Sequence, residues 1–380
     1  MSDLSKLSDL PALKQLARAL WHNGSIRGAA LMVGAGFSKN AILQAPDTRD
    51  APSWNELLVE LVAQLYPTDQ LCAPKDALRI AEEYRTYFGQ ATLDGFVRTR
   101  FTDRAWLPGP LHLQALNLPW SDILTTNWDT LLERTADEVT DYIYEVVRTE
   151  ADIAHARNPR IVKLHGTLGD KDPLIFAAED YRTYPERHAA FVNLARQIFI
   201  ENDLCLLGFS GNDPNFLGWV GWVRDQLGGH ARRIYLAGYL NLSASARKYM
   251  EAHNIAPVDI APLVGHLPKK ERYGAATKIF LDALRAEQPP APDDWKQHAP
   301  SEYPRASVDF FSRARTDEAF AAEALKETAR LLRDDRERAT QGGWYVRGES
   351  AADRFMGMLN GPSSNPLSSP LLSHRNVPRS

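Results

Sequence analysis

The segment Ala29-Ala30-Leu31-Met32-Val33-Gly34-Ala35-Gly36-Phe37-Ser38 is a short apolar run followed by Gly-Ala-Gly-x-Ser. This pattern predicts a buried strand that turns directly into a phosphate-binding loop. Glycine at positions 34 and 36 lacks a Cβ, which would let a pyrophosphate approach backbone N–H groups, and the helix expected next would direct its positive end at the anion. Because Lys39 occupies the third glycine position of the Gly-x-Gly-x-x-Gly fingerprint, an ordinary strand-to-helix turn is the alternative.

Length, charge and cysteine content limit the protein classes. The chain has 380 residues, enough for one large domain or two, and its net charge of −4 argues against a dominant nucleic-acid-binding surface. We therefore expect nucleic acid to be met only indirectly, through a partner. The two cysteines, Cys72 and Cys205, supply neither a disulfide framework nor a Cys-x-x-Cys pair for zinc. Without a secretory segment in residues 1–21 or an apolar run of membrane-spanning length, we expect a cytoplasmic protein with no membrane partner.

Strand-like and helix-like segments alternate from residue 29 onward. Apolar runs predict strands at residues 29–33, 121–125, 160–164, 203–207, 233–237 and 255–260. Amphipathic or capped segments predict helices from residue 11 and at 53–65, 75–88, 93–100, 128–138, 214–226, 243–252 and 274–286. This alternation favours an α/β fold: a doubly wound, Rossmann-like, mainly parallel sheet with helical insertions and a helical C-terminal extension.

Composition also predicts the domain boundaries. Residues 1–28 form an N-terminal helix, residues 29–287 a nucleotide-binding domain, residues 288–360 a proline-rich linker with a helical extension, and residues 361–380 a disordered tail. The extension contains an amphipathic helix at residues 317–338, with Leu331 and Leu332 on its apolar side. This helix is either an oligomer or partner contact, or it packs on the body of the protein.

Polar residues follow two further predicted strands. Thr126-Asn127-Trp128-Asp129 comes after residues 121–125, and His165 ends the strand at 160–164. Because the carboxyl ends of parallel strands meet at one edge of a sheet, we expect Asn127, Asp129 and His165 beside the glycine loop. Helix capping at residues 126–129 and a structural role for the histidine are the alternatives.

These motifs together resemble the sirtuin superfamily. Gly34 to Ser38 matches its Gly-Ala-Gly-x-Ser loop, Thr126 to Asp129 its Gln/Thr-Asn-x-Asp motif, and His165-Gly166 its His-Gly motif. Gly208-Phe209-Ser210 stands where a Gly-Thr-Ser segment closes over the nucleotide. The four motifs occur in the family's order and span residues 29–240.

The resemblance implies a set of site residues for NAD. The residues expected to line the dinucleotide are Gly34, Ala35, Gly36, Ser38, Thr126, Asp129, Gly208 and Ser210, with Gly208 and Ser210 on the adenosine side. The expected catalytic residues are Asn127 and His165. The Asn127 amide would position water or the ribose hydroxyls, and His165 would accept a proton or only orient the ribose. Asp129 would hold the carboxamide of nicotinamide.

Two departures narrow the resemblance within the family. Protein-deacylating sirtuins carry four zinc cysteines after the His-Gly motif, whereas residues 167–202 contain no cysteine, so we expect no zinc. Pro52-Ser53-Trp54-Asn55-Glu56-Leu57 is similar to the Pro-Ser-Trp-x-x-Leu version found in sirtuin-like NADases of bacterial anti-phage defence. Within that group the chain most resembles the partner of a HerA-type DNA-translocating ATPase.

Three function classes follow from this resemblance. The first is an NAD glycohydrolase that depletes NAD in anti-phage defence and works as a homo-oligomer with a HerA-type ATPase partner. The second is a zinc-free sirtuin-type enzyme that transfers ADP-ribose or acyl groups to protein. The third is a non-catalytic scaffold that binds NAD or ADP-ribose. Release of free nicotinamide separates the first class from the third, and a product that stays on protein identifies the second.

Overall fold

The computed structural model describes residues 4–21, 28–45, 52, 54–68, 76–170, 173–209, 213–289 and 313–341. The chain divides into two compact units, Met1–Gln288 and Pro289–Ser380. The first unit contains the sheet and every predicted site residue. No helix within the described ranges is long and apolar enough to cross a membrane.

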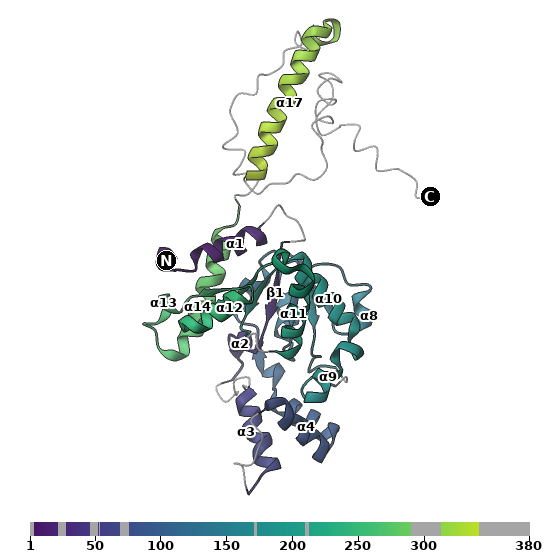
Figure 1. Cartoon of the computed structure of the whole chain (residues 1–380), viewed down its shortest axis with the longest axis vertical. Coiled ribbons are helices and arrows are strands. Elements are labelled where there is room, and N and C mark those ends of the chain that lie inside the picture. Colours follow the sequence, from purple (N-terminus) through teal and green to yellow (C-terminus); the bar gives the residue numbers. More distant parts are fainter. Residues whose placement is uncertain are drawn as a thin grey trace, which may run out of the picture. The chain divides into compact units, whose positions relative to one another are not determined.

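A seven-stranded sheet in the order β5-β6-β4-β1-β7-β8-β9 forms the centre of the first unit (Figure 1). All its neighbouring strands pair in parallel, and Met32 of β1 lies between Leu124 of β4 and Leu206 of β7. The strands are β1 (Ala29–Val33), β4 (Ile123–Thr125), β5 (Glu145–Val147), β6 (Arg160–Lys163), β7 (Asp203–Leu207), β8 (Ile234–Gly238) and β9 (Ile255–Asp259). The predicted α/β fold with a doubly wound, mainly parallel sheet is confirmed.

Helices cover both faces of this sheet, which explains why its strands are apolar throughout. Side chains alternate along each strand, so Leu31 joins one core and Met32 the other. The first core is covered by α1 (Leu10–Leu20), α6 (Pro110–Leu116) and α14 (Lys269–Ala286). The second is covered by α9 (Ala178–Arg187), α10 (Ala189–Glu201) and α11 (Pro214–Leu227).

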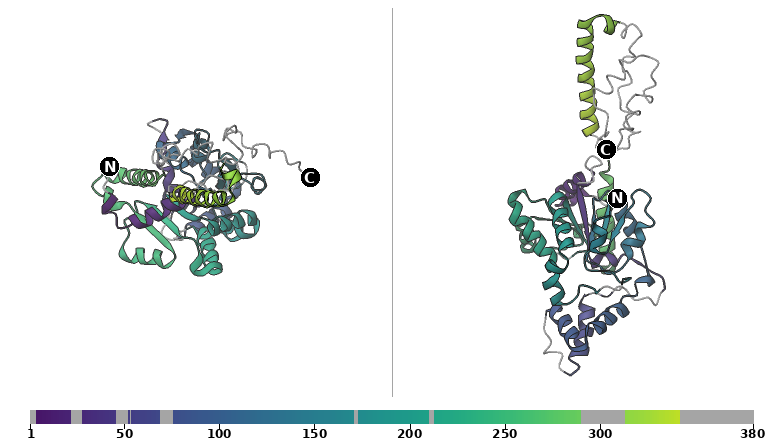
Figure 2. Two further views of the ribbon diagram at one scale, coloured as in Figure 1. Left: turned by 90° about the horizontal axis from the view of Figure 1, so that it is seen from above. Right: turned by 90° about the vertical axis from the view of Figure 1, so that its right-hand side faces the viewer.

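A helical module with its own core lies beyond the carboxyl ends of the strands (Figures 1 and 2). It consists of α3 (Trp54–Leu65), α4 (Ala77–Phe88) and α5 (Gln90–Arg100). Its core includes Leu61, Ile80 and Val97, and also takes in Trp128 and Phe176 from the loops of the sheet. A small antiparallel pair, β2 (Ile42–Leu43) and β3 (Trp106–Leu107), joins the two chain segments that flank the module.

The remaining elements of the first unit are short. They are α2 (Ala35–Ser38), α7 (Leu131–Ala136), α8 (Glu150–Ile153), α12 (Ala244–Ala252), α13 (Ala261–Val264) and the 3₁₀ turns Leu4–Lys6, Asp103–Ala105 and Gly228–His230. Capping explains where two predicted helices begin. The Asp213 side chain accepts from Phe216 N at the start of α11, and the Ser243 hydroxyl accepts from Ala246 N at the start of α12.

The structure corrects three local predictions. The helix after the glycine loop, α2, has only four residues, so little dipole is directed at a bound anion. The helix predicted at 128–138 begins at Leu131, because residues 127–130 remain in the loop that follows β4. Strand β5 was not predicted, since its three residues at the sheet edge are too few for a recognisable pattern. Ser53, the predicted cap of α3, lies outside the described residues.

The second unit contains one long described helix, α17 (Glu318–Gln341), which corresponds to the helix predicted at 317–338. The side chains of Leu331 and Leu332 are not among those described, and neither are residues 290–312 of the predicted linker and extension (288–360) or the predicted tail at 361–380. The contact role predicted for this helix therefore stays a prediction.

Candidate active site

A cavity of about 240 Å³ lies at the carboxyl edge of the sheet, between the strand ends and the helical module. It brings together seven of the predicted residues: Ala35, Gly36, Ser38, Thr126, Asn127, Asp129 and His165. Gly34 and Gly208 lie behind this lining, and Ser210 lies outside the described residues. Trp54, Phe101, Tyr181 and Asp213 also line the cavity and were not predicted.

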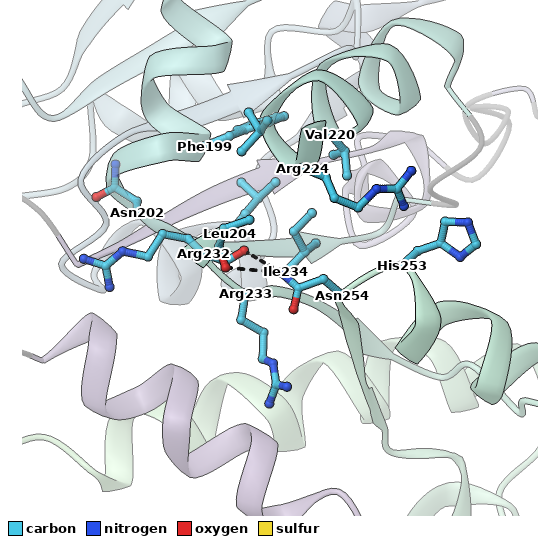
Figure 3. A pocket seen from close by; sticks show the side chains of 12 residues that line it. Phe199, Asn202, Leu204, Val220, Arg224, Arg232, Arg233, Ile234, His253 and Asn254 are labelled. Atoms are coloured by element: carbon cyan, nitrogen blue, oxygen red, sulfur yellow. Dashed lines mark hydrogen bonds between the residues drawn. The ribbon is translucent and has the colours of Figure 1, made fainter. Parts of the chain in front are cut away.

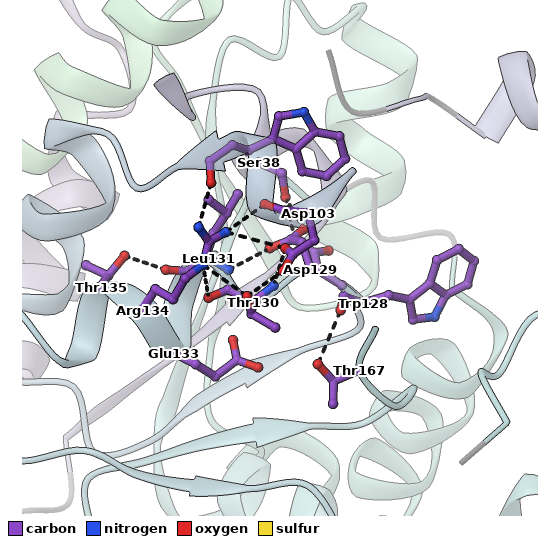
Figure 4. Close-up of polar contacts among 12 residues, drawn as sticks. Ser38, Asp103, Trp128, Asp129, Thr130, Leu131, Glu133, Arg134, Thr135 and Thr167 are labelled. Atoms are coloured by element: carbon purple, nitrogen blue, oxygen red, sulfur yellow. Dashed lines mark hydrogen bonds and ion pairs between the residues drawn. The ribbon is translucent and has the colours of Figure 1, made fainter. Parts of the chain in front are cut away.

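A buried hydrogen-bond chain connects the glycine loop to the loop after β4 (Figure 4). The Ser38 hydroxyl donates to Asp129 Oδ2 at 2.7 Å, and Asn127 Nδ2 donates to Ser38 Oγ at 3.0 Å. A carboxylate only accepts and the hydroxyl has a single proton, so Ser38 must accept from Asn127 through its amide nitrogen. The orientation of the Asn127 amide follows from this chain.

The same chain leaves an acceptor without a partner. Asn127 is 8% exposed, and its Oδ1 is buried with no hydrogen-bond partner among the described residues. A buried acceptor without a partner destabilises the protein by about 1–3 kcal/mol, so its retention calls for an explanation. Asn127 lines the cavity, so a water or a hydroxyl of a bound molecule is a candidate partner for Oδ1.

Neighbouring strand ends hold this loop in place. The Thr125 hydroxyl donates to Val33 O at 2.9 Å and accepts from Asn127 N at 3.0 Å. From β6, Lys163 Nζ donates to the backbone carbonyl of Asp129 and pairs with Glu133 Oε1 at 3.2 Å. Burial raises the pKa of Glu133, and Lys163 opposes that shift. Lys163, which was not predicted as a site residue, is thus a positioning residue for the loop.

Both carboxylate oxygens of Asp129 accept hydrogen bonds from within the protein. Oδ2 accepts from Ser38, and Oδ1 accepts from Leu131 N at 3.2 Å at the start of α7. This geometry favours a role in orienting Ser38 and Asn127. The predicted contact with a carboxamide stays a prediction.

His165 lies at the end of β6 and is 2% exposed. Its Nε2 lies 3.3 Å from Asn215 Nδ2 and 3.9 Å from Asp213 Oδ2, both at the start of α11. Burial lowers the pKa of His165, and the charge of Asp213 opposes that shift. The imidazole is therefore neutral near pH 7, and the Asp213 carboxylate would stabilise the imidazolium formed by any proton transfer to it.

Asp213 and Asn215 were not predicted as site residues. The usable signal was the strand-loop-helix pattern at residues 203–227, in which the cap of α11 faces the same sheet edge as the other loops. Tyr181 of α9 adds a second contact, because its hydroxyl donates to Asp213 Oδ2 at 3.3 Å. Its ring also meets the His165 ring edge-on at 5.3 Å between centroids.

The structure gives a different reason from the predicted one for glycine at positions 34 and 36. Gly34 N donates to O of Leu207, the last residue of β7, at 3.1 Å, and Gly36 N donates to O of Gly208, the first residue after that strand, at 2.9 Å. A Cβ on Gly34 would lie 2.5 Å from the Gly208 carbonyl oxygen, and a Cβ on Gly208 would lie 2.3 Å from Phe37 N. Close packing of two loops requires glycine here, whereas the prediction had left these amides free for a pyrophosphate.

Aromatic side chains form the module side of the cavity. The rings of Trp54 and Phe176 stack at 5.0 Å between centroids, and Trp128 meets Trp54, Phe101 and Phe176 edge-on at 6.0, 5.4 and 5.3 Å. The cavity therefore has an apolar wall opposite the polar wall made by Asn127 and His165. Such a combination is typical of a small-molecule site.

A second cavity lies at the opposite edge of the sheet (Figure 3), where residues that precede β7 and β8 form part of the lining. Its volume is about 20 Å³, which is room for a single water molecule. The cavity that Asn127 and His165 line at the carboxyl edge is therefore the candidate active site.

Comparisons with known proteins show what this chain is similar to. A family model described as "SIR2-like domain" matches residues 121–258, which include Asn127 and His165. Defense-associated sirtuin 2 of Bacillus subtilis is 26% identical over 262 residues, covering 66% of this chain and 25% of that protein. NAD(+) hydrolase ThsA of Acinetobacter baumannii (strain 532279) is 28% identical over 196 residues, covering 49% of this chain and 37% of that protein.

A second ThsA, from Enterococcus faecium, is 24% identical over 205 residues, covering 51% of this chain and 40% of that protein. The chain thus spans between a quarter and two fifths of the length of these three curated relatives.

Proposed function

We propose that this chain is an NAD glycohydrolase, which cleaves NAD to nicotinamide and ADP-ribose and so depletes NAD in anti-phage defence. The observation that carries the proposal is the Asn127 side chain, whose Oδ1 has no described hydrogen-bond partner while its Nδ2 donates to Ser38. Asn127 lines the same cavity as the neutral His165. The relatives named NAD(+) hydrolase and defense-associated sirtuin support the same substrate and setting.

The reaction needs little covalent chemistry from the protein. The bond between the nicotinamide nitrogen and the ribose C1′ breaks, its electron pair leaves with neutral nicotinamide, and the sugar acquires oxocarbenium character. Water then forms a bond to C1′ and releases one proton. A site that orients the substrate and the water supplies most of the rate enhancement such a reaction needs.

Each residue has a role in this scheme. Asn127 Oδ1 accepts from the attacking water or from a ribose hydroxyl and so fixes its direction. His165 accepts the released proton or holds the ribose, and Asp213 stabilises its charged form. By the resemblance, Gly34, Ala35, Gly36, Ser38 and Thr126 would serve the phosphate and ribose side, and Gly208 and Ser210 would serve the adenosine side.

Regulation is the second part of the proposal. An NADase that is always active would exhaust the NAD of its own cell, so activity should depend on assembly. We propose a homo-oligomer that works with a HerA-type ATPase partner, with α17 as the contact element and without a resident zinc ion. A charged substitution at both Leu331 and Leu332 should then change oligomer size or partner co-purification.

The test is direct product analysis. Purified chain, alone and with its co-purified partner, is incubated with NAD, and nicotinamide, linear and cyclic ADP-ribose are separated by chromatography. We expect stoichiometric nicotinamide and ADP-ribose, and at least about 100-fold slower product formation with Asn127→Ala. ADP-ribose retained on protein would replace hydrolysis by transfer, and NAD binding without any nicotinamide would leave only a binding role.

A further inference from the structure

Tyr273 lies in the second turn of α14 and has a buried hydroxyl without a hydrogen-bond partner in the described part of the chain. Burial raises the pKa of this phenol, so the hydroxyl keeps its proton at neutral pH and is a hydrogen-bond donor. A buried hydroxyl left unpaired destabilises the folded protein relative to phenylalanine, which has the same shape without the polar atom. Tyr273 therefore has no evident structural reason to be tyrosine.

The position of this hydroxyl connects it to the glycine loop. A Cβ on Gly36 would lie 3.0 Å from Tyr273 Oη and 2.9 Å from the Gly208 carbonyl oxygen. The phenol thus meets the bare Cα of Gly36 at the point where the loops after β1 and β7 pack together. Gly36 also lines the candidate active site, so the hydroxyl lies next to a residue of the cavity wall.

The sheet order indicates which part of a dinucleotide reaches this point. Asn127 and His165 follow β4 and β6, on one side of β1, whereas Gly208 follows β7 on the other side. The strands that come before β7 in sequence lie on one side of β1, and those from β7 onward lie on the other. Open α/β sheets bind their ligands at such a switch point in the strand order. With the nicotinamide ribose at Asn127, the diphosphate lies over the junction of β1 and β7.

Two of the backbone donors described at that junction are already used. The amides of Gly34 and Gly36 already donate to Leu207 O and Gly208 O, and α2 is only one turn long. A diphosphate needs hydrogen-bond donors because its charged oxygens lose water on binding. The unpaired phenol supplies one.

We propose that Tyr273 is a binding residue for the diphosphate of the dinucleotide, to which its hydroxyl donates a hydrogen bond. The identity of the dinucleotide rests on the proposed function. The diphosphate contact itself can be tested with ADP, which needs no cleavage.

The experiment compares Tyr273→Phe with Tyr144→Phe. The Tyr144 hydroxyl is also buried but donates to Leu116 O at 2.8 Å, so it is a matched structural tyrosine. A hydrogen bond to a charged group contributes about 1.5–3 kcal/mol, and we expect Tyr273→Phe to weaken ADP binding at least about tenfold by calorimetry. The KM for NAD should rise by a similar factor with a smaller change in kcat.

Thermal unfolding separates a binding role from a structural one. Ligand-free Tyr273→Phe should unfold at the same temperature as the wild type or higher, and ADP should stabilise it less. Tyr144→Phe should show the opposite pattern, with lower stability and unchanged ADP affinity.

Each result bears on a definite claim. Weakened ADP binding by Tyr273→Phe supports the inference even if the wild type cleaves no NAD, an outcome that would contradict only the proposed function. Unchanged ADP affinity and KM in an active Tyr273→Phe variant would overturn the inference and leave the function standing. Absence of ADP binding by the wild type would also overturn it.

Discussion

At the amino end of β4 the Asp122 carboxylate is surrounded by donors, whereas at the carboxyl end of the same strand Asn127 keeps an acceptor oxygen with none. Asp122 accepts from Arg160 Nε at 2.8 Å, Arg160 Nη2 at 3.2 Å and Asn158 Nδ2 at 2.9 Å. Asn127 Oδ1 is equally buried but has no described partner. The carboxylate at the amino end of β4 is fully hydrogen-bonded within the protein, and the acceptor oxygen at the carboxyl end is left for a ligand.

This difference separates stability from function along a single strand. Groups paired inside the protein contribute to the free energy of unfolding, and a group left unpaired for a substrate lowers it. Substitutions at the two ends should therefore have opposite consequences.

The largest effect is expected for Asn127→Ala and His165→Ala. Each should lower NAD cleavage by about 10² to 10⁴-fold, the usual contribution of a positioned catalytic group, while thermal unfolding changes little. Nicotinamide release and calorimetry measure the two quantities. Retained turnover in both variants would refute the assignment.

A matched control lies at the amino end of β7. Asn202 is buried, accepts from Gly28 N at 3.0 Å and donates to Ile198 O at 3.1 Å. Asn202→Ala should lower the free energy of unfolding by about 1–3 kcal/mol and leave turnover unchanged well below its unfolding temperature. The same loss of turnover in both asparagine variants would erase the distinction between the two ends.

Asp122→Ala should lower the free energy of unfolding by about 3 kcal/mol, because it leaves Arg160 without its carboxylate partner in a nearly enclosed position. Denaturant unfolding gives this value, and NAD cleavage by the folded variant should match the wild type. If activity fell in proportion to stability, the amino end would also serve the reaction.

Stability should fall in acid because two buried histidines resist protonation. Burial lowers the pKa of His112 from 6.5 to about 4, and burial lowers the pKa of His165 as well. The unfolded chain then binds protons that the folded chain does not. The contribution of the two histidines to the free energy of unfolding is therefore complete above about pH 6.5. It decreases as the pH falls below that value, by about 1.4 kcal/mol per pH unit for each histidine.

For His112 this loss continues down to about pH 4. His112→Gln should therefore flatten the curve of unfolding free energy against pH between about 4 and 6.5. Curves of identical slope for the variant and the wild type would contradict the assignment of this histidine.

The smallest effect is expected from metal removal. In the described ranges, no group of three or more His, Cys, Asp or Glu side chains is arranged to hold a metal. Chelators should alter neither the unfolding temperature nor NAD cleavage. Stoichiometric zinc that leaves together with activity would show that the site depends on a metal.

Much of the fold was predictable because the buried strands are continuous apolar runs. The predicted bounds of β1 and β7 agree with the structure, since each is a five-residue run with a glycine after it. The convergence of Asn127, Asp129 and His165 also followed, because parallel strands bring their carboxyl ends to one edge.

The contacts that orient these residues were not predictable from local pattern. Ser38 and Asp129 are 91 residues apart, and the sequence around neither names the other as a partner. The aromatic wall depends on where the helical module folds over the sheet, and a tryptophan such as Trp54 reads equally well as ordinary core. The packing role of Gly34 and Gly36 was not predictable because the carbonyls that accept from their amides belong to Leu207 and Gly208, far along the chain.

Trp128 connects the helical module to the loop that carries Asn127. Its backbone carbonyl accepts from Leu168 N at 2.9 Å, next to Asn127, while its indole is part of the core of the module. Trp128 therefore connects the packing of the three helices to the loop that carries Asn127. A regulator that binds the outer surface of the module, for example at the exposed Tyr87, would therefore act on the catalytic Asn127 through Trp128.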